Sequence, residues 1–124
     1  MIERRTWWLT AGFAAGLLLT GIPYWRLPYN ADYFADPLVL GGFVALAVVA
    51  AILVASGATS IGQALGATVA AFPAAVMIRV VVDTAKDPTD HNLWPFELII
   101  AAIVSLAAVL PGLLVGAIVR RLRG

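Results

Sequence analysis

The residues best suited to chemistry lie in one stretch of the chain, between positions 79 and 97. Arg79 and Asp83 are four residues apart, so on a helix their side chains share one face and can pair. Glu97 opens a second apolar segment that returns to the same level. A charge at the edge of an uncharged run is costly unless it pairs or reaches water. We therefore expect a structural clamp between segments 60–84 and 95–119; the alternatives are simple snorkelling of Arg79 and a ligand or ion site.

The single histidine, His91, lies near Asp87 and Asp90, and a histidine with carboxylates can bind a divalent cation. The spacing does not favour this chemistry, because the stretch has no second histidine and lacks the central glycine and final glutamate of an EF-hand loop. The favoured interpretation is a loop histidine that bonds locally or caps the next helix. We assign no metal and no cofactor, and Asp87, Asp90 and His91 remain the metal-ligand candidates.

Aromatic and proline residues fill the segment 23–37, which also carries Arg26. Tyr24 and Trp25 are typical of rings anchored at a membrane interface, so an interfacial cap is the favoured interpretation. The alternative is that Arg26 holds a lipid phosphate or a partner's carboxylate. The candidate ligand-binding or partner-binding residues are Arg26, Arg79, Asp83, Asp87, Asp90, His91, Trp94 and Glu97.

The composition requires a membrane around these residues. Of the 124 residues, 62% are hydrophobic and 12% charged, whereas soluble domains have roughly a quarter charged. A helix needs about 20 apolar residues to cross about 30 Å of hydrocarbon. Four runs meet this requirement, and we predict an all-α integral membrane protein, a four-transmembrane-helix bundle forming a single membrane domain over 1–124, with spans at about 7–24, 37–56, 60–84 and 95–119.

Local signals set the expected helix ends. Asp36 before Pro37 is a helix start, and Ser60 with Gln63 fits a capping box. Pro88 disfavours helical geometry at Asp87, which predicts the end of the third segment.

The charges are divided between the two ends of the predicted spans. The end with both termini has five arginines against Glu3, a balance of +4, and the other end has a balance of −3. The positive-inside rule then places both termini in the cytoplasm of a plasma membrane of the bacterial inner-membrane type. Eight basic residues against seven acidic ones give no one-signed surface for phosphates, so we expect no nucleic-acid partner.

Pairs of glycines four residues apart occur in three predicted spans, and small residues at this spacing allow helices to approach closely in lipid. We expect these pairs to pack the bundle; the alternative is that one of them forms a homo-oligomer contact. The pairs are Gly12 and Gly16, Gly62 and Gly66, and Gly112 and Gly116.

Enzyme activity is not expected, because the chain has no cysteine and none of its three serines lies on the outward side with His91. We predict a non-catalytic subunit, or a protein that binds a ligand or partner through the outward loops, with the bilayer, itself or a larger membrane complex as partner. The alternative is a small homo-oligomeric channel or transporter for an ion or small solute. Its path would have to use the polar residues at depth, Thr10, Thr20, Gln63, Thr68 and Ser105.

Overall fold

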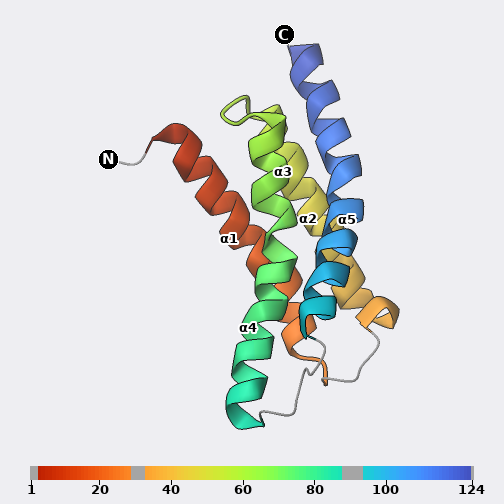
Figure 1. Ribbon diagram of the computed structural model, residues 1–124. Coiled ribbons are helices and arrows are strands. Elements are labelled where there is room, and N and C mark those ends of the chain that lie inside the picture. Colours follow the sequence, from red (N-terminus) through yellow and green to blue (C-terminus); the bar gives the residue numbers. More distant parts are fainter. Residues whose placement is uncertain (1–2, 29–32, 88–93, 124) are drawn as a thin grey trace.

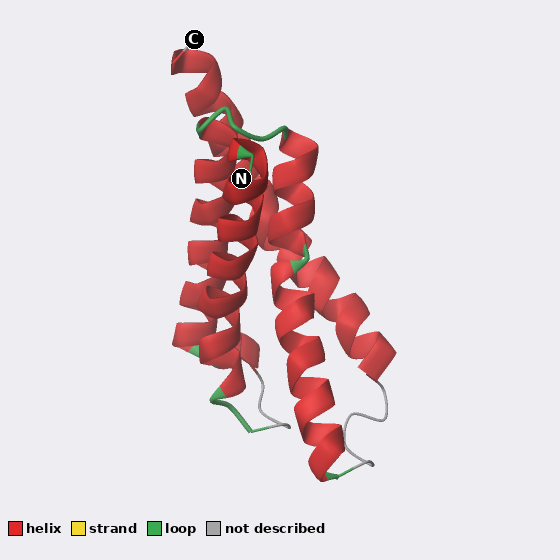
Figure 2. Ribbon diagram, turned by 90° about the vertical axis from the view of Figure 1, so that its left-hand side faces the viewer, coloured by secondary structure: helices red, strands yellow, loops and turns green. Residues whose placement is uncertain are grey.

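The computed structural model describes residues 3–28, 33–87 and 94–123, and these residues form helices and short connections without a strand (Figures 1 and 2). The elements are α1 (Arg4–Trp25), the short 3-10 helix η1 (Tyr33–Ala35), α2 (Pro37–Ala55), α3 (Ile61–Val69), α4 (Ala71–Lys86) and α5 (Trp94–Arg123). Both termini lie at one end of the bundle (Figure 1). The expected all-α fold is confirmed.

Helices α3 and α4 run end to end and form a single rod with a break at Ala70 (Figure 1). Pro73 explains the break, because it has no N–H to donate to the carbonyl of Val69 one turn earlier. The regular pattern resumes at Ala74, whose amide donates to the Ala70 carbonyl over 3.0 Å. The described chain therefore forms four rods, which fits the predicted number of helices.

The predicted helix boundaries at Asp36, Ser60 and Asp87 are confirmed. The Asp36 carboxylate accepts hydrogen bonds from the amides of Leu38 and Val39 at 3.0 and 3.1 Å. Ser60 and Gln63 form both bonds of a capping box. Helix α4 ends at Lys86, two residues before the proline.

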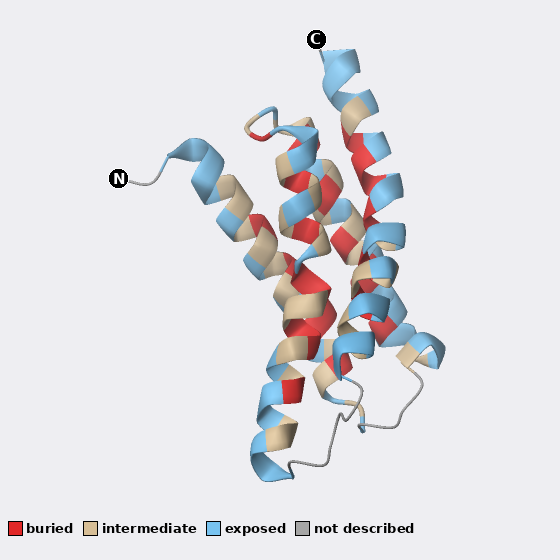
Figure 3. Ribbon diagram, viewed as in Figure 1, coloured by how far each residue is buried: buried red, intermediate tan, exposed pale blue. Residues whose placement is uncertain are grey.

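Three rods are long and apolar enough to cross a membrane: Pro37–Ala55, Ile61–Lys86 and Trp94–Arg123. Helix α1 has a suitable length of 22 residues but is not among them. Its arginines, threonines and tryptophans lower its mean hydropathy. Buried residues follow the inward side of the rods, and exposed residues the outer side (Figure 3). Many of the exposed residues are large and apolar.

The glycine pairs on α1 and α5 pack inside the bundle, as expected. A Cβ atom on Gly112 would lie 2.0 Å from the Ala47 carbonyl oxygen of α2, and one on Gly116 would lie 2.6 Å from that of Ala51. Added Cβ atoms on Gly12 and Gly16 would overlap leucine side chains of α2. These four glycines therefore allow α2 to approach both α1 and α5.

The third pair does not follow this expectation. Gly62 and Gly66 are exposed, and a Cβ atom on either would have no other atom within 4 Å. The reason is the rotation of α3, which turns Ala64 and Thr68 toward the bundle and buries them. This face of α3 is open in the described structure.

Gly42 of α2 packs over the Leu19 carbonyl of α1, which has no helical hydrogen-bond donor. Pro23 has no N–H to bond the carbonyl of Leu19. Gly42 packs directly over that carbonyl, and a Cβ atom there would lie 2.5 Å from the oxygen. Gly42 of α2 thus lies against the backbone of α1 at the carbonyl that Pro23 cannot bond.

Candidate functional site

The predicted ion pair on α4 is present. Arg79 Nε donates to Asp83 Oδ2 over 3.2 Å, and the two side chains are only 11% and 21% exposed. Helical spacing alone brings these groups together, since they lie one turn apart on one face. The pair partly neutralises Arg79 near the end of a long apolar rod.

Arg79 also joins α4 to α1. Its Nη1 donates to the Tyr24 carbonyl over 3.2 Å, and its guanidinium lies 5.2 Å from the centre of the Tyr24 ring, within cation–π range. In the reverse direction, Trp25 Nε1 donates to the Ala75 carbonyl of α4 over 2.9 Å. Each helix thus donates a side-chain hydrogen bond to the other's backbone. We call the contacts made by Tyr24, Trp25, Ala75 and Arg79 the α1–α4 latch.

The expected clamp between segments 60–84 and 95–119 stays a prediction. Among the contacts described for Arg79, the link to another helix goes to α1. Glu97 is half-buried in the first turn of α5. The described contacts thus join Arg79 to Asp83 on its own helix and to Tyr24 of α1.

An aromatic layer lies beneath this cluster. The Tyr24 ring packs edge-on against Phe72 and Tyr33, with centroid distances of 5.4 and 5.6 Å, and Phe43 meets Phe72 at 4.9 Å. Such edge-to-face pairs stabilise packing beyond the area that they bury. Tyr24 is 7% exposed, so it is a core residue and not the interface anchor that its position near the end of α1 suggested. The physical reason is that the ring of Phe72, from α4, packs against the Tyr24 ring near the end of α1.

Arg26 is paired within its own loop. Its Nη2 contacts Asp36 Oδ1, and the same carboxylate caps α2. Burial opposes ionisation of Asp36, but the hydrogen bonds from Arg26 and from the amides of Val39 and Leu38 outweigh it and lower the pKa of that carboxyl. Arg26 thus ties the end of α1 to the start of α2.

A hollow of about 280 Å³ lies beside the latch, with residues of α1 and α4 in its lining. The basic groups exceed the acidic ones there, because Lys86 joins the Arg79–Asp83 pair. Trp25 and Lys86 were not among the predicted site residues. The position of Trp25 carried no signal for its bond to α4, and Lys86 is recognisable only once the helix is known to continue to it. The lining is Trp25, Ile78, Arg79, Val82, Asp83 and Lys86.

The remaining predicted site residues occupy the ends of α4 and α5 or fall outside the described ranges. Asp87 is exposed and follows the last residue of α4, and Trp94 is the first residue of α5 and 42% exposed. Asp90 and His91 lie outside the described residues. Within 3–28, 33–87 and 94–123, no three histidine, aspartate or glutamate side chains are grouped so as to hold a metal ion.

Three of the polar residues expected at depth bond within their own helix or cap, and a fourth, Ser105, bonds to another helix. Thr20 and Thr68 each donate to a carbonyl one turn earlier on their own helix, both over 2.7 Å. Ser105 donates to the Thr68 carbonyl over 3.5 Å and so links α5 to α3. Gln63 closes the capping box, and Thr10 is exposed. No buried side-chain nitrogen or oxygen in the described part of the chain lacks a hydrogen-bond partner.

Comparison with known proteins gives no assignment: no family model, no curated protein and no solved structure matches this chain.

Proposed function

We propose that this protein is a multi-pass protein of a bacterial-type plasma membrane, with four transmembrane helices and both termini in the cytoplasm. The supporting observation is the outer surface of the rods, where large apolar side chains are exposed along their length. Only 28 to 39% of the residues in the three most apolar windows are buried inside the structure. Such a surface is an aggregation hazard in water and suits hydrocarbon.

The orientation is supported by the segregated charge. The end with the termini carries Arg4, Arg5, Arg120, Arg121 and Arg123, and such clusters stay on the cytoplasmic side. The chain has no cysteine, so single-cysteine variants have no background. In intact cells, a membrane-impermeant maleimide should label Ala35→Cys, and it should label Leu122→Cys only after permeabilisation. The reverse pattern would overturn the orientation.

The protein acts, in this proposal, as a non-catalytic subunit or binding protein through its outward end. The observation that carries this proposal is the hollow beside the α1–α4 latch. The exposed Lys86 lines this hollow together with the partly buried Arg79–Asp83 pair and the indole ring of Trp25. A cationic group beside an aromatic face suits a partner's carboxylate or another anionic group.

Gentle detergent purification tests this role. The wild-type chain should elute with a larger membrane complex, and Lys86→Glu should lose that association because it reverses the charge at the hollow. Arg121→Glu is the matched control, since it makes the same charge change at the opposite end. A stable homo-oligomer that elutes alone and passes ions in liposomes would instead support the channel or transporter alternative.

A further inference from the structure

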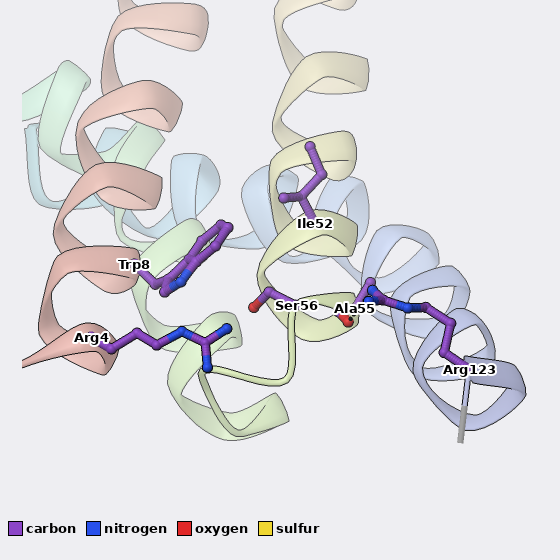
Figure 4. A pocket seen from close by; sticks show the side chains of 6 residues that line it. All are labelled: Arg4, Trp8, Ile52, Ala55, Ser56 and Arg123. Carbon is purple, nitrogen blue, oxygen red and sulfur yellow. Dashed lines mark hydrogen bonds between the residues drawn. The ribbon is translucent and has the colours of Figure 1, made fainter.

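A second hollow, of about 430 Å³, opens at the end with the termini, between the start of α1 and the end of α2 (Figure 4). Arg4 and Trp8 face Ser56 and Ile52 across it, and Arg123 lies beyond Ser56 and donates to the Ala55 carbonyl over 3.2 Å. The residues lining this hollow include two arginines and no carboxylate. In the described ranges, neither arginine has a carboxylate within ion-pair distance.

An apolar groove continues from this opening. A hollow of about 180 Å³ follows α1 and α2 toward the middle of the bundle, and it shares Trp8 and Ile52 with the basic opening. Its lining on α1 consists of small residues, Ala11, Gly12 and Ala15, together with the two tryptophans. The small side chains of α1 leave space beside Val49, Ile52 and Leu53 of α2, which line the opposite side of the groove.

The length of the combined feature fits one leaflet of a bilayer. Arg4 and Ala15 are eleven residues apart, which is roughly 16 Å at the helical rise of 1.5 Å per residue. Half of a hydrocarbon core of about 30 Å is about 15 Å. The apolar groove alone, from Trp7 to Ala15, is roughly 12 Å long, so it covers most of the chain region of one leaflet below a cationic opening at headgroup depth.

We propose that this feature, the α1–α2 groove, binds one anionic phospholipid. The phosphate lies against Arg4, with Arg123 adding positive charge, and one acyl chain follows Trp8, Ala11 and Ala15 along the groove. Guanidinium groups suit phosphate oxygens because two parallel N–H bonds can form. The absence of a carboxylate from the described lining favours a lipid with net negative charge over a zwitterionic one, whose ammonium group finds no acid there.

The test measures phospholipid binding to the detergent-solubilised full chain by native mass spectrometry. Phosphatidylglycerol should bind more tightly than phosphatidylcholine. Arg4→Gln should weaken phosphatidylglycerol binding about fivefold, since one basic residue near a membrane surface contributes ~1 kcal/mol. Arg5→Gln is the matched control: it removes the same charge from a neighbour that lies 3.6 Å from Glu3 and does not line the groove. Equal losses in the two variants would overturn the proposal.

The apolar half of the groove is tested separately. Ala15→Phe should fill it and lower phosphatidylglycerol binding, while Ala14→Phe, on the exposed side of α1, should leave binding unchanged. Ala11→Leu provides a second blocking variant if Ala15→Phe does not fold. The proposal is supported if a folded blocking variant loses binding and Ala14→Phe does not. Unchanged binding in a folded blocking variant overturns it.

A soluble phosphate ester distinguishes binding of a whole phospholipid from binding of a phosphate group alone. Glycerol 3-phosphate, which has no acyl chain, should raise the melting temperature much less than phosphatidylglycerol at equal concentration. Equal shifts would show an anion site only and overturn the lipid assignment. The inference rests on the proposed membrane placement but fails independently of it, because binding is measured in micelles and placement by maleimide labelling.

Discussion

The seam between α2 and α5 and the outer face of α3 carry the same glycine spacing in opposite surroundings. At the seam, Gly112 and Gly116 lie so close to the Ala47 and Ala51 carbonyls that a methyl group has no room. On α3, Gly62 and Gly66 have nothing within 4 Å of an added Cβ. The motif by itself therefore does not indicate packing.

The difference lies in what each helix places beside its glycines. The seam pairs two glycines with two alanines, so small residues meet on both sides and the backbones approach closely. On α3, the packed face belongs to Ala64 and Thr68, and the glycine face is left outside. Close approach needs small residues on both helices and the correct rotation of each.

The largest effect should follow a change at the seam. Gly112→Ala places a methyl group 2.0 Å from a carbonyl oxygen, and a backbone atom cannot move aside as a side chain end can. We expect a loss of about 2–3 kcal/mol of stability, the upper part of the range for overpacking. Thermal unfolding in a mild detergent measures it. An unchanged melting temperature would show that α2 and α5 are not in such close contact.

The α1–α4 latch should contribute less than the seam. Arg79→Ala removes the bonds to Asp83 and Tyr24 and leaves Asp83 without this partner, which should cost about 1–2 kcal/mol because bonds to charged groups are stronger than neutral ones. Arg79→Lys should restore only part of the melting temperature, since lysine lacks the planar fork. If Arg79→Ala keeps full thermal stability but loses partner binding, the latch is a binding element and not a structural one.

The open face of α3 should tolerate added side chains. Gly66→Ala has space around it and removes the helical penalty of glycine, so stability should stay equal or rise by up to about 1 kcal/mol. The same melting experiment used for Gly112→Ala checks it. A loss of stability together with a shift to smaller particles in size-exclusion chromatography would show that this face packs against a second copy.

The smallest effect should come from the Arg26–Asp36 contact at the exposed start of α2. Because folding lowers the pKa of Asp36, the folded state binds fewer protons than the unfolded state there, and the contribution of Asp36 is lost as the pH falls. The loss should begin as the pH drops below about 4, the ordinary aspartate range, and continue through the lowered pKa. Asp36→Asn should remove this part of the acid dependence of the melting temperature.

Helix boundaries could be predicted from the sequence because their signals are local. Asp36 lies next to Pro37, and Ser60 lies three residues from Gln63, so the caps are readable within one turn. The Arg79–Asp83 pair is local in the same sense. In each case both partners lie on one element.

The contacts between elements could not be predicted in this way. Arg79 and Tyr24 are 55 residues apart, and Arg26 contacts Asp36 across a loop. These contacts depend on how each helix is rotated, and α2 gives no guide because it is apolar all round. For the same reason, the two glycine pairs that pack within the bundle could not be told from the pair that does not. Asp90 and His91 lie outside the described residues, so their roles as binding or metal-ligand candidates stay predictions.

The connection after α2 is completed by two residues at the end of α5. Arg120 donates to the Thr59 carbonyl and Arg123 to the Ala55 carbonyl, each over 3.2 Å, across separations of 61 and 68 residues. During synthesis the ribosome delivers α2, α3 and α4 long before these arginines. The carbonyls of Ala55 and Thr59 therefore lack their arginine donors until the ribosome has passed residue 123, and a chain stopped at residue 119 never acquires them.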